Sequence, residues 1–188
     1  MRQEITSTDV TATTLPMRVT LRRSWVGAAR RTMAIAFLRI AFGLIWSVDA
    51  ALKWQPAFQT NFSQIVAGVA QGQPSFLSWW FGLWQLIVSG RAPIFAVLTA
   101  TTETYLAFAL IAGFARKFTY SIGIAYGLFV WSVAEGFGGP YVPGTTTDVG
   151  AAIIYSLVFW ALLLVDAGGM SVDRLITARI PAWRRISD

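Results

Sequence analysis

The stretch LRIAFGLIWSVDAALKW, residues 38–54, decides the class of this protein. It is almost wholly apolar, yet Arg39 lies inside it, and Asp49 and Lys53 stand near its end. A water-soluble domain buries such a helix only with difficulty, whereas a bilayer accommodates an apolar helix whose few charges face other helices. The stretch therefore predicts the first of several membrane spans around a polar interior.

The composition of the whole chain agrees with this interpretation. Of its 188 residues, 55% are hydrophobic and only 13% are charged, whereas soluble domains carry about 25% charged residues. The formal net charge is +6, and twelve of the fifteen lysines and arginines lie in blocks that flank apolar runs. This placement is typical of membrane topology signals and leaves no basic face for nucleic acid. We expect the lipid bilayer as a partner and no nucleic acid.

The sequence contains no cysteine and no histidine. This excludes disulfides, iron–sulfur clusters and histidine-ligated haem or copper within the chain. There is also no phosphate loop, nucleophile elbow or cluster of metal-ligating residues, which argues against a hydrolase or an NTPase. We expect no metal and no covalently bound cofactor, so a role in electron transfer would depend on a diffusible cofactor or on a partner.

Apolar runs predict an all-α fold, an integral membrane four-helix bundle. Its spans are expected at about residues 33–52, 94–114, 118–134 and 149–165, close to the ~20 residues that cross a bilayer. These spans divide the chain into a basic tail (1–32), a membrane domain (33–166) and a basic amphipathic tail (167–188). A cleaved signal peptide is the alternative for the first run, but Arg39 and the long polar leader argue against it.

The connection between the first two spans predicts an additional helical segment on the outer, periplasmic side. Residues 56–71 carry apolar side chains at helical spacing, which indicates an amphipathic helix at the membrane surface. Residues 76–88 are very apolar but too short for a span, so we expect a re-entrant or interfacial segment. Its Trp79, Trp80 and Trp84 are expected to be interfacial anchors at the lipid headgroups.

The basic residues predict the orientation of the chain. With four spans, both tails and the Arg116–Lys117 turn lie on one side of the membrane, and only Lys53 and Arg91 lie on the other. Cytoplasmic loops carry the excess of Lys and Arg. We therefore expect both the N-terminus and the C-terminus in the cytoplasm.

Two ionisable residues within the predicted spans form the candidate polar site. The number of residues between each charge and the end of its span, multiplied by the rise of an α-helix, gives its depth in the bilayer. The depths of Arg39 and Glu103 obtained in this way differ by about 5 Å. An ion pair between them is expected, because intramembrane charges usually pair inside the bundle. One hypothesis is a site for a quinone headgroup, a proton or a substrate anion; the alternative is a pair that only sets the helix register.

Four further charged residues are candidates for the outer mouth of the bundle: Asp49, Lys53, Glu135 and Asp148. Capture of a cation or a proton is one hypothesis, and solvated loop acids with a snorkelling Lys53 are the alternative. Residues 40–49 also resemble residues 124–135, and both segments end in a carboxylate. This similarity indicates either a parallel repeat of two helical hairpins or a coincidence.

Two motifs carry a resemblance to a known family. Arg39-Ile40-Ala41-Phe42-Gly43-Leu44 with Lys53, and Glu103 followed by Leu110-Ile111-Ala112-Gly113-Phe114-Ala115-Arg116, resemble the DoxX/DoxD-like family of small four-helix bacterial membrane proteins. The resemblance covers about residues 33–166. It implies a multi-pass protein of the bacterial inner membrane that associates with oxidoreductases. One branch of the family is similar to the small subunit of thiosulfate:quinone oxidoreductase, which implies a quinone as the ligand.

The leading hypothesis is an accessory or quinone-facing subunit of a membrane redox complex, rather than an enzyme that is catalytic on its own. A purely structural or assembly subunit, which docks onto a larger membrane enzyme through its tryptophan-rich face, is the first alternative. A small transporter or channel is the second alternative, because of the repeat and the outer carboxylates.

Overall fold

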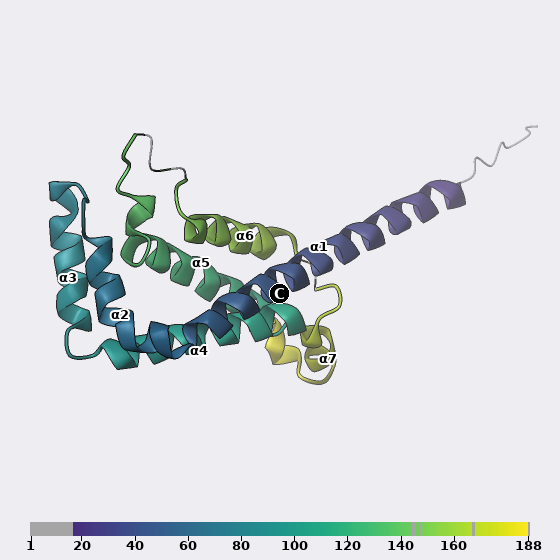
Figure 1. Ribbon diagram of the computed structural model, residues 1–188. Helices are drawn as coiled ribbons and strands as arrows, with labels where there is room; N and C mark the ends of the chain where they lie inside the picture. Colours follow the sequence, from purple (N-terminus) through teal and green to yellow (C-terminus); the bar gives the residue numbers. More distant parts are fainter. Residues whose placement is uncertain (1–16, 144–145, 147, 167, 188) are drawn as a thin grey trace, which may run out of the picture. The chain divides into compact units, whose positions relative to one another are not determined.

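The computed structural model describes residues 17–143, 146, 148–166 and 168–187, with side chains from residue 27 onward. All regular secondary structure in these residues is helical (Figure 1), which confirms the all-α expectation. The chain forms two compact units that meet after Arg31. Helix α1 (Met17–Lys53) belongs to both units, and the site described below lies entirely in the unit that begins at Thr32.

The helices lie close to the positions that the hydropathy pattern predicts. After α1 come α2 (Pro56–Val69), α3 (Ser78–Val88), α4 (Ala92–Ala112), α5 (Arg116–Val133), α6 (Ala151–Val165), α7 (Val172–Arg179) and α8 (Arg184–Ser187), with 3-10 turns η1 (Ser75–Leu77), η2 (Gly136–Gly138) and η3 (Pro181–Trp183). Both α2 and α4 have a proline in their first turn. Proline is favoured there because backbone N–H groups in the first turn of a helix have no partner within the helix, so its lack of an N–H costs no hydrogen bond. Gly113 ends α4 in the left-handed conformation, with φ of 64°.

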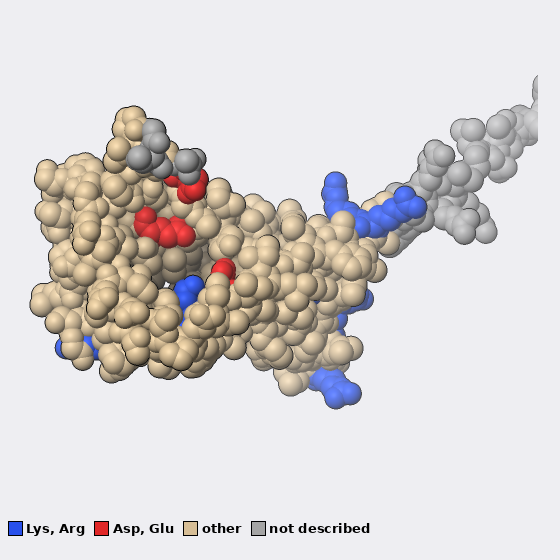
Figure 2. Space-filling view, viewed as in Figure 1, with Lys and Arg blue, Asp and Glu red and all other residues tan. Residues whose placement is uncertain are grey.

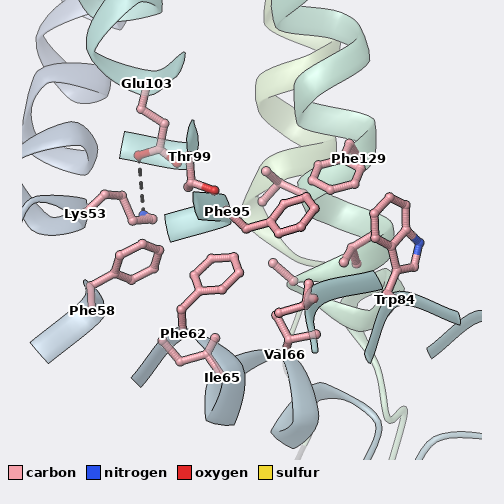
Figure 3. A pocket seen from close by; sticks show the side chains of 14 residues that line it. Lys53, Phe58, Phe62, Ile65, Val66, Trp84, Phe95, Thr99, Glu103 and Phe129 are labelled. Carbon is pink, nitrogen blue, oxygen red and sulfur yellow. Dashed lines mark ion pairs between the residues drawn. The ribbon is translucent and has the colours of Figure 1, made fainter. Parts of the chain in front are cut away.

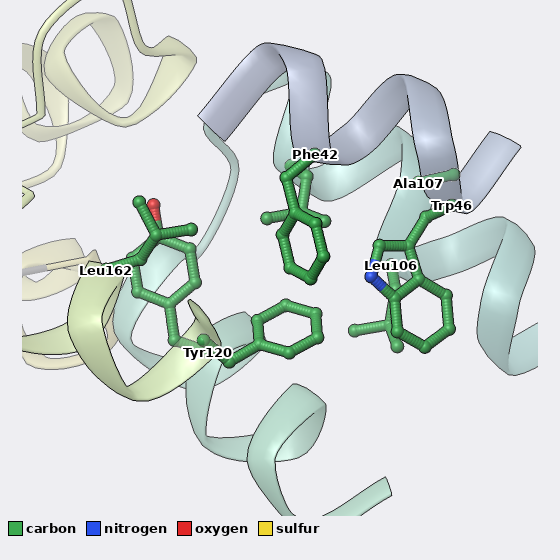
Figure 4. Packing of buried hydrophobic residues seen from close by; sticks show 8 residues of the cluster. Phe42, Trp46, Leu106, Ala107, Tyr120 and Leu162 are labelled. Carbon is green, nitrogen blue, oxygen red and sulfur yellow. The ribbon is translucent and has the colours of Figure 1, made fainter. Parts of the chain in front are cut away.

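The hydrophobic core lies between α1, α4, α5 and α6 (Figure 4). Its buried members are Phe42, Trp46, Leu106, Ala107, Leu110, Tyr120, Phe159 and Leu162. The ring of Phe42 meets that of Phe159 edge to face, with 4.9 Å between their centroids. Such aromatic pairs add to the burial of apolar area, so the first helix and the last long helix are joined directly although their sequences are far apart.

Two glycines allow these helices to approach closely. A Cβ added at Gly43 of α1 would lie 2.8 Å from Ile111 of α4, and one at Gly123 of α5 would lie 2.5 Å from the ring of Phe159. At either distance the neighbouring side chain or the helix that carries it would have to shift. Small residues are typical of such contacts between membrane helices.

Two helical segments of the described chain are long and apolar enough to cross a membrane. These are Gly27–Lys53 of α1 and the whole of α4. Ser75–Val88 and α6 are apolar but shorter. Of the four spans expected from the sequence, two therefore meet the criterion of length and composition.

Helices α2 and α3 run side by side between the start of α4 and the end of α5 (Figure 1). Trp80 donates its indole N–H to the carbonyl of Ser132 at 3.0 Å, and the ring of Trp84 lies 4.9 Å from that of Phe129. Trp79 is 65% exposed. Of the three tryptophans expected as interfacial anchors, only Trp79 faces outward, because the other two are used to attach α3 to α5.

The contact between α5 and α6 yields a first prediction. Gly123→Ala is expected to lower the free energy of unfolding by about 1–3 kcal/mol, because the new methyl group overlaps the Phe159 ring. The matched control is Gly68→Ala in α2, where an added Cβ meets no atom within 4 Å. Alanine favours a helix over glycine, so the control should be neutral or stabilising. Thermal unfolding in mild detergent measures both, and equal stability of the two variants would contradict the tight contact.

Candidate functional site

Glu103 pairs with Lys53, not with Arg39 as the sequence predicted. The Lys53 ammonium lies 3.5 Å from Oε2 of Glu103, and the Glu103 side chain is almost completely buried. Arg39 stands fourteen residues before Lys53 on α1, which corresponds to about 21 Å along the helix axis. The predicted pair was wrong because depth was counted from the ends of the apolar runs, whereas α1 continues without a break on the N-terminal side of Arg39.

Helix α5 completes the environment of this carboxylate. Tyr126 donates its hydroxyl hydrogen to Oε1 of Glu103 at 2.9 Å. Next to the pair, Trp54 donates its indole N–H to the hydroxyl of Thr104 at 3.0 Å, which holds the end of α1 against α4. The pair is thus fixed from three helices, as expected for a charge that is removed from water and needs compensating partners.

An apolar cavity opens beside the pair, between the α2–α3 segment and helices α4 and α5 (Figure 3). Its volume is about 80 Å³. Aromatic side chains dominate its wall: Phe58, Phe62, Trp84, Phe95 and Phe129. Lys53 and Glu103 lie at its edge, joined by the ion pair. The space therefore combines an apolar aromatic wall with one cationic donor and one carboxylate.

The true partner of Arg39 is Asp166, at the end of α6. Their closest atoms, Nη1 and Oδ2, are 3.4 Å apart, and both side chains are fully buried. Arg39 also donates to the carbonyl of Met170 at 2.7 Å. The hydroxyl of Tyr120 and the guanidinium of Arg116 reach the same carboxylate, the latter at 3.7 Å. One buried acid thus joins α1, α5 and α6.

Asp173, from the segment expected to be only a basic tail, extends this cluster of charged residues around Asp166. Its carboxylate accepts the backbone N–H groups of Ala115 at 2.7 Å and Arg116 at 2.9 Å, and so caps the start of α5 from another helix. The side chain of Arg116 donates to it at 3.2 Å, and the indole of Trp183 donates at 2.8 Å. Two arginines and two aspartates therefore balance their formal charges at this end.

The four residues expected at the outer mouth separate into two groups. Asp49, Lys53 and Glu135 line one common hollow together with Glu103. Asp148 does not line it and accepts the backbone N–H of Gly150 at 2.8 Å. Since Asp49 and Glu135 end the two similar segments 40–49 and 124–135, the similarity in sequence corresponds to a shared position in space.

Sequence reasoning did not assign several residues of the two polar clusters to a site, among them Tyr120, Tyr126, Asp166 and Asp173. A tyrosine within an apolar run and an acid at the end of one are common, so neither pattern by itself indicates a partner. Asp173 lies outside the predicted spans altogether. The available signal was the need for charge balance, because the buried Arg39 requires a buried acid.

Within the described residues, no group of three or more Asp and Glu side chains is placed to hold a metal ion. Comparison of the chain with protein-family models, with curated protein sequences and with solved structures found no match. The candidate site therefore rests on its own geometry.

Removal of one charge from the cluster of charged residues around Asp166 provides a second prediction. Arg39→Met is expected to lower the free energy of unfolding by about 3 kcal/mol or more, because Asp166 loses one of its two guanidinium partners while it stays buried. The matched control is Lys117→Met, which removes an exposed cation in the first turn of α5 and should unfold like the unmodified protein. Chemical unfolding in detergent measures both, and an Arg39→Met variant as stable as the control would show that the pair is dispensable.

Proposed function

We propose that this chain is an integral membrane protein whose α1, α4, α5 and α6 cross the bilayer, and that it serves as an accessory subunit of a redox complex. In this proposal a quinone binds at the aromatic cavity beside Lys53 and Glu103. The DoxX-like sequence pattern is part of the support. The observation that carries the proposal is the Lys53–Glu103 ion pair, buried beside an apolar aromatic cavity.

The distribution of side chains supports membrane insertion. Large apolar residues face outward on all four helices, among them Phe37, Leu44 and Val48 of α1, Ile94, Leu98 and Phe108 of α4, Phe118 and Leu128 of α5, and Ile154, Trp160 and Leu164 of α6. On the face drawn in Figure 2, charged residues occupy few places. Soluble monomers rarely expose such extensive apolar surface. Charges inside and apolar groups outside are the arrangement that a lipid environment favours.

The position of the ion pair supports a functional role for it. Helix α4 has 21 residues, which span about 31 Å, the thickness of the hydrocarbon core. Glu103 lies near the middle of this helix. A buried carboxylate inside a span is expensive, and such ionisable residues are typical of ligand or proton sites. Its partner Lys53 is the last residue of α1 and supplies the compensating charge.

The chemistry of the cavity supports a lipophilic ligand with a polar carbonyl head. The Lys53 ammonium group can donate to a carbonyl oxygen, and the aromatic wall can contact a flat ring. The volume of about 80 Å³ is smaller than the ~150 Å³ cavity that holds benzene. A quinone ring would therefore displace Phe58 or Phe62, which come from α2, outside the four-helix core.

The proposed topology is tested by single cysteines, since the natural chain contains none. Tyr141→Cys in the loop after α5 is expected to react with a membrane-impermeant maleimide. The reaction is carried out on cells whose outer barrier has been removed and whose inner membrane is intact. Lys117→Cys, at the opposite end of α5, should react only after the membrane is opened. Tyr141 and Lys117 are both exposed, so burial does not explain a difference. Reaction of both cysteines in intact cells would contradict the four-span arrangement.

Quinone binding is tested on the purified protein with a decyl-tailed ubiquinone analogue, followed by tryptophan fluorescence. Trp84 lines the cavity, so saturable quenching is expected. The double variant Lys53→Met/Glu103→Gln removes both charges together and leaves no uncompensated one. It should weaken binding about tenfold or more, which corresponds to about 1.4 kcal/mol or more. Arg91→Ala, which removes the other outer cation, is the control and should bind like the unmodified protein.

Unchanged affinity of the double variant would refute the cavity as the quinone site.

A second candidate function has its own observation: α3 and the preceding turn present an outward apolar row of Phe76, Trp79, Leu83 and Leu86. This row suits docking of an assembly subunit onto a larger membrane enzyme. Purification of a stoichiometric partner without any quinone binding would favour that function.

A further inference from the structure

A polar hollow lies where α5 begins and α6 ends. Its volume is about 310 Å³, within the range of about 300–1,000 Å³ that is typical of ligand sites. Its wall includes Lys117 and Ser121 of α5, Leu163 of α6 and Ser187 of α8. The hollow also borders the buried Arg116 and Asp166, so it adjoins the charged cluster and opens past an exposed lysine.

The buried charges of this region compensate one another, whereas the exposed charges do not. Asp166 is paired with Arg39 and Arg116, and Asp173 is paired with Arg116. Five exposed cations take part in no ion pair within the part of the chain that the structure describes: Lys117, Arg174, Arg179, Arg184 and Arg185. An excess of positive charge therefore lies at this surface.

Contacts within the fold bring these cations to one region. Asp173 of α7 caps the start of α5, and the ring of Trp183 lies 5.3 Å from that of Phe114. Helix α8 contacts α5 and contributes Ser187 to the hollow. On the face drawn in Figure 2, basic side chains are visible where Figure 1 labels α7, and no acidic side chain is visible there. The charge therefore favours an anionic ligand.

Large apolar side chains on the same elements are exposed beside these cations. Leu175 of α7 is 71% exposed, and Phe118 of α5 and Leu164 of α6 are exposed as well. A small soluble anion would leave these side chains uncovered, whereas a lipid covers them with its acyl chains. Cations interleaved with exposed apolar residues are typical of segments that bind anionic lipids at the membrane surface.

We propose that this hollow binds the phosphate headgroup of an anionic phospholipid. The Lys117 ammonium group donates to the phosphate, and Arg184 and Arg185 of α8 add to the positive potential around it. The acyl chains lie along the exposed apolar faces of α5 and α6. The inference rests on the membrane insertion proposed above but not on quinone binding, since Lys117 does not line the aromatic cavity.

Thermal unfolding of the purified, delipidated chain in an uncharged detergent tests this site. Dioleoylphosphatidylglycerol is titrated into the micelles, and dioleoylphosphatidylcholine, which has the same chains but no net charge, is the reference. A ligand of the folded state raises the melting temperature as its concentration rises. We expect a saturable rise with the anionic lipid that exceeds the rise with the reference lipid.

Lys117→Met should weaken the apparent affinity for the anionic lipid about fivefold, since one cation near a lipid surface contributes about that much. Without added lipid it should unfold like the unmodified protein. The matched control is Arg91→Met, which removes the same charge from an exposed residue before α4, away from the hollow, and should leave the affinity unchanged.

Three results would overturn the proposal: equal rises with the two lipids, equal affinity of Lys117→Met and Arg91→Met, or a rise of the same size with inorganic phosphate, which has no acyl chains. Failure of the lipid site and failure of membrane insertion are distinguishable. Equal rises with the two lipids leave the cysteine labelling pattern intact, whereas a wrong topology changes that pattern.

Discussion

The ion pairs of the buried Asp166 carboxylate are the interaction on which the end of the structure around Arg39 and Arg116 depends. Two guanidinium groups, those of Arg39 and Arg116, and the hydroxyl of Tyr120 all reach it. Because an unpaired buried charge would be very costly, α1 and α5, which supply these groups, have to keep their positions relative to the end of α6. Asp173 adds the cap of α5. The charged network therefore sets the register of helices whose remaining contacts are apolar and could slide.

At the other end, the Lys53–Glu103 pair divides the interior into two spaces of different chemistry. The space toward α2 and α3 is aromatic and small, and the space toward α6 is lined by acids. The proposed quinone, a neutral lipophilic ring, belongs to the aromatic space. Lys53 and Glu103 border both spaces, so a change in their pairing would alter the charge that each space presents.

Much of the helical layout could be predicted from the sequence, and much of the site could not. The ends of α4 and α6 lie within two residues of the predicted spans, because Pro93, Gly113 and the apolar runs act locally. The predicted pair of Arg39 and Glu103 was wrong, because the partner of a buried charge depends on which parts of two helices face each other, and the sequence does not show this. Similarly, Trp80 and Trp84 belong to the contact with α5, which a local aromatic pattern cannot indicate.

The sequence by itself determined the all-helical class, the short helical segments between the first two long apolar runs, and the residues that carry charge inside apolar runs. These follow from composition and periodicity, which act over a few helical turns. Only the tertiary structure decided the partners: Lys53 for Glu103, Asp166 for Arg39, and Asp173 for the start of α5. The physical reason is that a buried charge can be compensated by any opposite charge that packing brings near, and packing joins residues as far apart as Arg39 and Asp166.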